Sequence, residues 1–275
     1  MKILANDGIS DLGKSLLEAA GHTVSTQKVA QETLADSINS MGFDAVLVRS
    51  ATTVRKEVID ACPGLKLIGR GGVGMDNIDV AYARDKGLTV INTPASSSQS
   101  VAELVMGQLF SISRFLNDSF KNIQDQDFST LKKNYAKGVE LRGKTLGIIG
   151  FGRIGQNLAA YALGVGMKVI AIERRARVQP IQLKIGGQTF EIPVKVVDSL
   201  AEVIDQLDYI SIHVPKQTNG QAVIGSKEFA QMKKGVRIVN TARGGVIEEQ
   251  ALLSALEDGT VAAAALDVYE NEPNP

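Results

Sequence analysis

The sequence predicts an α/β protein made of two doubly wound parallel-sheet domains. Its 275 residues exceed the usual size of one domain, which suggests two. Short apolar runs alternate with helical patterns along almost the whole chain, and strands separated by helices indicate βαβ units. The alternation also comes in two series, one within residues 1–96 and one that begins at Thr145.

Residues 1–96 are expected to form the first domain, of the flavodoxin-like type. Ser10 or Asp11 can cap a helix that ends at Gly21. One strand is expected before this helix, at Lys2–Ala5, and three are expected after it, at Phe43–Val48, Leu65–Gly69 and Leu88–Ile91. Helices are expected between these later strands, at Val54–Ala61 and Ile78–Lys86. Because helices separate these strands, the sheet should be parallel.

Residues 97–275 are expected to form the second domain. Its first helix, Ser100–Phe115, has nearly continuous apolar residues, which predicts burial on several sides, and the polar stretch Lys121–Val139 suggests a crossing or contact segment. The strands expected here are Thr145–Ile149, Lys168–Ile172, Tyr209–His213, Val236–Asn240 and Val261–Leu266. The helices expected between them are Gln156–Leu163, Ser199–Leu207, Lys227–Lys233 and Glu248–Glu257.

One segment does not fit this alternation. Apolar and polar residues alternate over Ile181–Ile192 around Gly186-Gly187, a pattern typical of a β-hairpin with a tight turn. Since a hairpin is unexpected between a strand and a helix of a doubly wound domain, we interpret the segment as an insertion.

Composition excludes several function classes. Acidic and basic residues balance at 30 each, which argues against a nucleic-acid partner. The single cysteine, Cys62, excludes an internal disulfide and a multi-cysteine metal site, and no metal is expected. The first residues become polar too soon for a signal peptide, and no apolar run is long enough for a membrane span. We therefore expect a cytoplasmic protein without membrane partners.

A glycine motif carries the strongest functional signal. Gly150, Gly152 and Gly155 form a GxGxxG pattern that closes an apolar strand and opens a helix, the context in which this motif binds dinucleotides. Gly150 permits the tight turn, Gly152 lets the backbone approach a pyrophosphate, and Gly155 lets helix and strand pack closely. The free N–H groups at the helix start favour phosphate. The second domain is therefore predicted to be a Rossmann domain.

The next strand ends in an acidic residue, which bears on the choice of cofactor. Glu173 can accept hydrogen bonds from the hydroxyl groups of the adenosine ribose, which favours NAD. Arg174 and Arg175 follow directly and could instead meet the 2′-phosphate of NADP. Glu173 should repel that phosphate, so NAD is the predicted cofactor.

Two further segments leave strands at the carboxyl edge of the second sheet, where ligands of open α/β sheets bind. Arg243, within Asn240–Gly245, can grip a carboxylate through two parallel hydrogen bonds, or it is a surface arginine in a turn. The acidic run Leu266–Pro273 offers a carboxylate that can orient a histidine base, or it is a solvated loop.

The first domain has a glycine loop of its own. Arg70–Asn77 follows a strand, and bare N–H groups there can form an anion-binding nest, although a purely structural turn is equally compatible. Arg49 and Ser50 end the neighbouring strand and could add a charged partner. Neither histidine is expected to be a base: His22 lies in a turn, and His213 belongs to the cofactor wall.

These segments resemble, in order and spacing, the D-isomer-specific 2-hydroxyacid dehydrogenases over essentially the whole chain. The segments that carry the resemblance are Arg70–Asp79, Asn92–Pro94, Ser100–Leu104, Leu146–Gly155, His213–Pro215, Asn240–Gly245 and Leu266–Pro273. Within the family, Val48–Thr52 and Asn92–Pro94 most resemble the D-3-phosphoglycerate dehydrogenases.

The resemblance implies a reaction and a set of roles. Hydride would pass between C2 of a 2-hydroxy acid and the nicotinamide ring while a histidine moves the hydroxyl proton. Arg243 would bind the carboxylate and carbonyl oxygen, and Glu272 would pair with the histidine. The remaining roles implied are substrate contacts at Arg49, Ser50, Gly72, Val73 and Gly74, pyrophosphate contacts at Arg153 and Ile154, and a cofactor wall of Val73, His213, Val214, Pro215, Thr241, Ala242, Arg243 and Asp267.

One departure from the family concerns the base itself. The family's histidine follows the Glu-Pro segment, and the chain reaches Pro275 before any such residue. The family's last segment, which returns to complete the first domain, is also absent. We therefore expect a longer natural protein, and poor turnover from these 275 residues alone, since a general base contributes about 10²- to 10⁴-fold in rate.

Three functions remain open. The first is NAD-dependent oxidation of D-3-phosphoglycerate to 3-phosphohydroxypyruvate, in L-serine biosynthesis. The second is a glyoxylate, hydroxypyruvate or D-lactate type of 2-hydroxyacid reductase, and the third a non-catalytic NAD-sensing binding protein. The family also implies a homodimer or homotetramer, with Ser100–Phe115 and Lys121–Val139 as candidate contacts.

Overall fold

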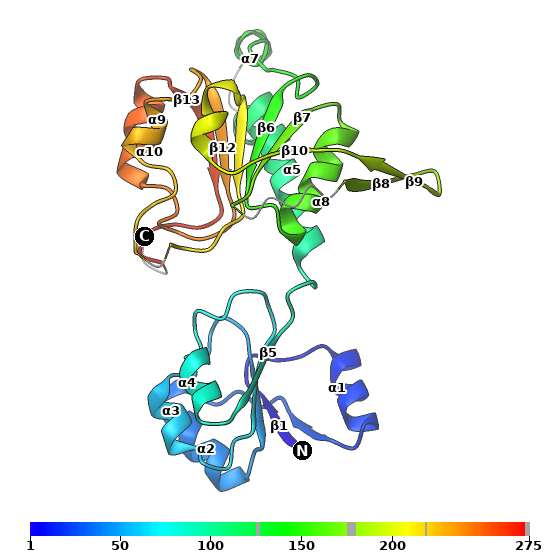
Figure 1. The fold of residues 1–275 in the computed structure, drawn as a ribbon, viewed down its shortest axis with the longest axis vertical. Coiled ribbons are helices and arrows are strands. Elements are labelled where there is room, and N and C mark those ends of the chain that lie inside the picture. The colour runs from blue at the N-terminus through cyan, green and yellow to red at the C-terminus, as the bar shows by residue number, and fades with distance from the viewer. Residues whose placement is uncertain (125–126, 175–179, 218, 273–275) are drawn as a thin grey trace. The chain divides into compact units, whose positions relative to one another are not determined.

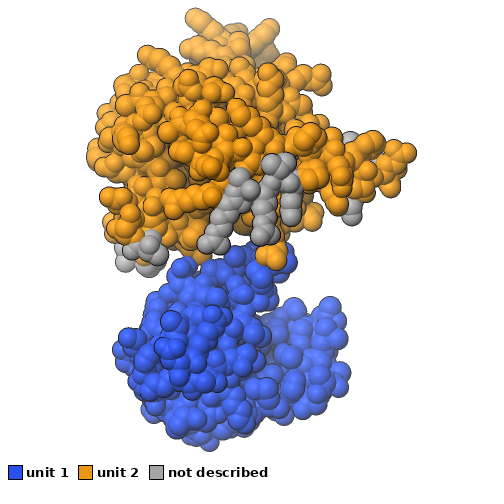
Figure 2. Space-filling view, viewed as in Figure 1, with its two compact units in different colours: residues 1–97 blue, residues 98–275 orange. Residues whose placement is uncertain are grey.

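The computed structural model describes residues 1–275 except 125–126, 175–179, 218 and 273–275. The chain divides into two compact units, unit 1 at Met1–Ser97 and unit 2 at Ser98–Pro275 (Figure 2). Each unit contains one parallel sheet with helices on both faces, so the predicted α/β fold class is confirmed.

Unit 1 contains a five-stranded sheet of order β2-β1-β3-β4-β5, the flavodoxin-like order. Its strands are β1 (Lys2–Ala5), β2 (Thr23–Ser25), β3 (Ala45–Val48), β4 (Leu67–Arg70) and β5 (Thr89–Asn92). Helices α2 (Leu34–Met41), α3 (Lys56–Ala61) and α4 (Val80–Asp85) cover one face, and α1 (Asp11–Ala19) covers the other (Figure 1). Register pairs Val48 with Arg70 and Arg70 with Asn92, so the loops after β3, β4 and β5 share one edge.

Unit 2 contains a six-stranded parallel sheet of order β10-β7-β6-β11-β12-β13, the order of a Rossmann domain. Its strands are β6 (Thr145–Ile149), β7 (Lys168–Ile172), β10 (Lys195–Val197), β11 (Tyr209–Ile212), β12 (Val236–Asn240) and β13 (Val261–Leu266). Helices α5 (Ser98–Arg114) and α8 (Arg153–Gly164) pack together on one face, and α9 (Ser226–Phe229) and α10 (Glu249–Glu257) on the other (Figure 1).

The predicted hairpin is present. Strands β8 (Ile181–Ile185) and β9 (Gln188–Ile192) pair antiparallel in the predicted register, with Ile181 opposite Ile192. Gly186 and Gly187 both have positive φ, at 56° and 81°, as the tightest hairpin turns require. Ile181 is buried in the core that α5 and α8 share, so the root of the hairpin belongs to the domain body.

Several secondary-structure predictions were wrong or incomplete. Ser199–Leu207 is not one helix but two 3₁₀ turns, Leu200–Glu202 and Ile204–Gln206, because Val203 between them has φ −138° and breaks the helix. The segment Lys121–Val139 contains α7 (Phe128–Tyr135) and the end of α6 (Leu116–Asn122). The short β2 and β10, the 3₁₀ turn Gln31–Thr33 and α2 were not predicted.

The long helix α5 is also less enclosed than its composition suggests. Ala102, Val105 and Leu109 on one face are buried, whereas Leu104 and Phe110 on another are 43% and 39% exposed. One face of α5 therefore packs onto α8 and the sheet, and the other is left at the surface.

Candidate functional site

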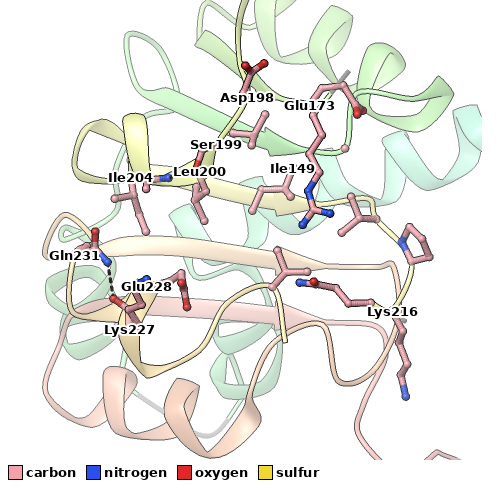
Figure 3. Close-up of a pocket in the computed structure, with 18 of the residues that line it drawn as sticks. Ile149, Glu173, Asp198, Ser199, Leu200, Ile204, Lys216, Lys227, Glu228 and Gln231 are labelled. Carbon is pink, nitrogen blue, oxygen red and sulfur yellow. Dashed lines mark hydrogen bonds between the residues drawn. The ribbon is translucent and has the colours of Figure 1, made fainter. Parts of the chain in front are cut away.

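A cavity of about 750 Å³ lies in unit 2 at the carboxyl end of the sheet. Its walls include Gly150 after β6, Glu173 after β7, and Val214 and Pro215 after β11. Strand order reverses between β6 and β11, and doubly wound sheets bind ligands at such a reversal. Figure 3 shows Glu173 and Asp198 on one rim of this cavity, and Lys227 and Glu228 on the opposite rim.

Three glycines beside the cavity differ in what a side chain would meet. Gly150 has φ +92°, and a Cβ there would lie 2.7 Å from the carbonyl oxygen of His213, so the turn excludes other residues. A Cβ on Gly155 would collide with the carbonyl oxygen of Gly150, at the contact between α8 and β6. A Cβ on Gly152 would meet nothing within 4 Å. Gly152 therefore leaves space that the protein itself does not fill.

The start of α8 is suited to an anion. Gly152 is the N-cap of this helix and supplies no side-chain hydrogen bond to its first N–H groups. Arg153 follows in the first helical position, is exposed, and adds a positive charge. Free N–H groups and the helix dipole together favour phosphate oxygens at this point.

Glu173 connects the strand end to the glycine loop. One oxygen of its carboxylate, Oε2, accepts a hydrogen bond of 3.1 Å from the backbone N–H of Phe151. The side chain is thereby held at the cavity wall, where its carboxylate can accept from ribose hydroxyls. Arg174 also lines the cavity, and Arg175 lies outside the described residues.

His213 lies after β11 in a setting that suits a structural residue. Its backbone N–H donates to the carbonyl oxygen of Ile149, and its Nε2 lies 2.9 Å from Oγ of Ser211. Burial lowers the pKa of His213 to about 4, so its imidazole is neutral at pH 7. The role of His213 in the cofactor wall, and not as the base, stays a prediction.

The loop that carries Arg243 is fastened by the buried Asn240. The Asn240 side chain donates to the carbonyl oxygen of Arg243 and accepts from the backbone N–H of Ala242, both at 3.0 Å. The Oγ1 atom of Thr241, in the same loop, is buried and has no hydrogen-bond partner among the described residues. A buried hydroxyl without a partner is costly, so a ligand that bonds to it would be favoured.

The acidic loop after β13 is held close to the Arg243 loop. Gly244 packs so tightly on the backbone of Tyr269 that a Cβ would collide with the Tyr269 carbonyl oxygen. Glu272 accepts a 2.6 Å hydrogen bond from the backbone N–H of Tyr269, so its carboxylate turns back onto its own loop. Pro273, the end of the predicted motif, lies outside the described residues.

A reciprocal pair of hydrogen bonds fixes the same acidic loop to α10. The Glu249 side chain accepts from the backbone N–H of Glu270, and the Glu270 side chain accepts from the backbone N–H of Glu249. Asp267 is tied in as well, since its N–H donates to the carbonyl oxygen of Asn240. The structure thus brings the Arg243 and Glu272 loops together.

The predicted substrate residues of unit 1 lie at the carboxyl edge of its sheet. Arg49 and Ser50 follow β3 and are exposed, and Gly72, Val73 and Gly74 follow β4. The glycine loop is held from β5, where the side chain of Asn92 donates to the carbonyl oxygen of Val73 at 2.7 Å.

Sequence reasoning missed some residues that the structure brings to these places. Asp198, Ser199 and Lys227 line the cavity of unit 2, and Asp7 and Asn77 hold the loop after β3 in unit 1. Asp7 could have been noticed as a polar residue two positions after a predicted strand. The others carry no local pattern that distinguishes them.

The described residues indicate neither a metal site nor a membrane span. They include no group of three His, Cys, Asp or Glu side chains that could hold a metal ion. No helix in the described part of the chain is long and apolar enough to cross a membrane.

Comparisons with known proteins agree with this site. Residues 106–275 match the family model described as D-isomer specific 2-hydroxyacid dehydrogenase, NAD binding domain. With the glycine loop, the uncapped start of α8 and the partnerless Thr241 hydroxyl, this match makes NAD the cofactor of unit 2.

Among similar proteins, a D-3-phosphoglycerate dehydrogenase of Methanocaldococcus jannaschii is 40% identical over 99% of this chain and 50% of its own length. A hydroxypyruvate reductase of Thermotoga maritima is 44% identical over 84% of this chain and 70% of its own. A solved glyoxylate reductase from Paecilomyes thermophila is 30% identical, with a TM-score of 0.81 over 99% of this chain and 82% of its own. The chain spans about half the length of the phosphoglycerate dehydrogenases that it matches.

Proposed function

The chain belongs to the D-isomer-specific 2-hydroxyacid dehydrogenase family, and we propose that it oxidises D-3-phosphoglycerate to 3-phosphohydroxypyruvate with NAD. In this proposal the reaction begins the phosphorylated route to L-serine. The supporting observation is a pair of arginines, Arg49 in unit 1 and Arg243 in unit 2, each in a loop at the carboxyl edge of its sheet. A substrate with a phosphate at one end and a carboxylate at the other needs two cationic groups. Arginine suits both ends, because it is the side chain that best matches both anions.

Unit 2 would bind the cofactor and the carboxylate end. The N–H groups and side chains of Arg153 and Ile154 would hold the pyrophosphate at the start of α8, and Glu173 would accept from the ribose hydroxyls. Arg243 would grip the substrate carboxylate and contact the C2 oxygen, and this second contact is strongest in the transition state, where that oxygen carries partial negative charge. When bound, NAD supplies the acceptor for the hydride that leaves C2.

The remaining roles concern the proton and the phosphate. Glu272 would orient and charge-stabilise a histidine that takes the hydroxyl proton. In unit 1, the substrate-binding unit of this proposal, the Gly72–Gly74 loop would supply N–H groups to the carboxylate, and Arg49 would meet the phosphate.

The second candidate is a hydroxypyruvate or glyoxylate reductase. It is favoured by the 44% identity to the Thermotoga maritima hydroxypyruvate reductase, the highest among the relatives named above. Hydroxypyruvate and glyoxylate have one anionic end, so such an enzyme has less use for a second arginine at the substrate site.

The experiment compares kcat/KM of the full-length protein for 3-phosphoglycerate and glycerate with NAD, and for hydroxypyruvate and glyoxylate with NADH. We expect 3-phosphoglycerate to exceed glycerate by roughly 30- to 150-fold, since the phosphate contact of an arginine is worth roughly 2–3 kcal/mol. The variant Arg49→Ala should remove most of that difference and leave glycerate unchanged. Equal use of the two acids, with rapid reduction of glyoxylate, would support the reductase instead.

We also propose that the protein is at least a homodimer. Beyond the exposed side of α5, helices α6 and α7 and the residues near them carry Phe120, Ile123 and Phe128, which are 81%, 65% and 76% exposed. Large apolar side chains with such exposures favour a protein partner, and a second copy of this chain is the partner proposed.

A further inference from the structure

Asp7 is a buried carboxylate for which the proposed reaction has no direct use. It lies two residues after β1, and its side chain is only 4% exposed. Its Oδ2 accepts from the backbone N–H of Arg49 at 2.7 Å and of Thr52 at 3.1 Å. Its Oδ1 accepts from the Thr52 hydroxyl at 2.7 Å and from Nζ of Lys28 at 2.5 Å. Asp7 therefore fixes both ends of the loop 49–52.

The same loop is fixed from its other side. The side chain of Asn77 donates to the carbonyl oxygen of Arg49 at 2.8 Å and to that of Thr52 at 2.6 Å. The side chain of Asn6 donates to the Thr52 hydroxyl at 2.9 Å, and Thr52 is itself buried. The backbone N–H and C=O groups of Arg49 and Thr52 are thus all held by side chains from other loops of unit 1.

The guanidinium of Arg49 is left available by this arrangement. Arg49 is exposed and forms no ion pair with any residue that the structure describes. A carboxylate held against the Arg49 backbone would ordinarily attract that guanidinium, because the chain brings them within one loop of each other. Lys28 occupies this role instead, since its ammonium group pairs with Asp7.

The charge of Asp7 is permanent at working pH. Burial by itself raises the pKa of Asp7, but the hydrogen bonds from Lys28, Thr52 and the Arg49 backbone outweigh it and lower that pKa to about 2. The hydrogen bonds to the loop therefore persist at every pH at which the enzyme would work.

We propose that Asp7 and Lys28 are positioning residues for the anionic end of the substrate. Asp7 holds the backbone of Arg49 at the carboxyl edge of the sheet, and Lys28 neutralises Asp7 so that the charge of Arg49 serves the substrate phosphate. This inference rests on the proposed function, in which Arg49 meets that phosphate. Neither residue touches the substrate, so both act through Arg49.

Asp44 offers a matched control within the same unit. Its carboxylate also accepts from one backbone N–H, that of Lys2 at 2.8 Å, and pairs with Nζ of Lys66 at 2.7 Å. Asp44 precedes β3, however, and so lies at the opposite edge of the sheet from Arg49. Asp44→Asn thus removes a lysine–aspartate pair, at a carboxylate that is 27% exposed where Asp7 is 4% exposed, without disturbing the loop 49–52.

The test measures KM and kcat of the full-length enzyme for 3-phosphoglycerate, and kcat/KM for glycerate, in Asp7→Asn, Lys28→Met and Asp44→Asn. For Asp7→Asn we expect KM for 3-phosphoglycerate to rise about tenfold, the loss of one charge-assisted contact, with kcat, NAD affinity and glycerate use within about twofold. Lys28→Met, a change at an exposed side chain, should shift KM in the same direction. Asp44→Asn should leave KM unchanged.

Two readouts separate this inference from the proposed function. Amide hydrogen exchange at Arg49 and Thr52 should become faster in Asp7→Asn whatever the substrate is. The unchanged enzyme tests the proposed function: if it does not prefer 3-phosphoglycerate to glycerate, that function fails. If the preference holds but Arg49→Ala leaves KM for 3-phosphoglycerate unchanged, the contact of Arg49 with the phosphate is refuted, and the positioning role with it. If Arg49→Ala raises KM while Asp7→Asn and Lys28→Met do not, or if Asp44→Asn raises it equally, the positioning role is refuted.

Discussion

Gly152→Ala should separate cofactor binding from folding. The Cβ of an alanine at this position meets no protein atom within 4 Å, and φ is −74°, which alanine adopts without strain. The loss of glycine as N-cap costs less than about 1 kcal/mol, and the reduced entropy of the unfolded chain offsets about 0.4–1 kcal/mol. The free energy of unfolding should therefore change by less than about 1 kcal/mol.

The affinity for NAD should change much more. The methyl group would enter the space in which a pyrophosphate meets the start of α8. Loss of one hydrogen bond to a charged oxygen is worth about 1.5–3 kcal/mol, which corresponds to a roughly 10- to 100-fold weaker Kd. Titration calorimetry with NAD gives Kd, and urea unfolding followed by circular dichroism gives stability.

Two other glycines of α8 complete the experiment. Gly155→Ala forces a Cβ against the carbonyl oxygen of Gly150, so it should destabilise the fold by about 1–3 kcal/mol or more. Gly164→Ala, at the far end of the helix and in open space, should alter neither property adversely. The reasoning fails if Gly152→Ala binds NAD as tightly as the unchanged protein, or if its loss of binding merely follows a loss of stability.

Three further results are expected. The pKa of His213 is about 4 in the folded protein and 6.5, its ordinary value, in the unfolded chain, so the unfolded chain takes up the proton first as pH falls. The contribution of neutral His213 to the free energy of unfolding is therefore full above pH 6.5 and lost as pH falls through about 4. In His213→Gln, the free energy of unfolding should change less with pH over that window, by up to about 3 kcal/mol. Identical plots of unfolding free energy against pH for the variant and the unchanged protein would contradict the assignment. In Gly244→Ala, the new Cβ collides with the Tyr269 carbonyl oxygen and should separate the Arg243 and Glu272 loops, which should lower kcat/KM more than about tenfold. Unchanged steady-state kinetics would argue that the two loops move independently. Phe120→Asp with Phe128→Asp should convert a dimer to monomers in sedimentation velocity, and an unchanged sedimentation coefficient would remove this surface as the interface.

The comparison of predicted and observed elements shows where local pattern is sufficient. The buried strands of both sheets, such as Thr145–Ile149, are apolar runs bounded by turn residues, and these were predicted correctly. The edge strands Thr23–Ser25 and Lys195–Val197 have three residues each, too few to show a period. For Ser199–Leu207, the buried Val203, Ile204 and Leu207 suit a helix and two 3₁₀ turns equally, so the spacing of apolar residues could not distinguish them.

The glycine loop is the part of the site that the sequence alone determined. Its signal is local: three glycines, a strand before them and a helix after them, all within a dozen residues, because backbone geometry at a turn depends on adjacent residues. The hold of Asp7 on Arg49, 42 residues away, and the contact of Gly244 with Tyr269 were decided by the tertiary structure. Parallel strands bring their carboxyl ends to one edge however distant they are in the chain, and only the packed sheet fixes which loop side chains meet there.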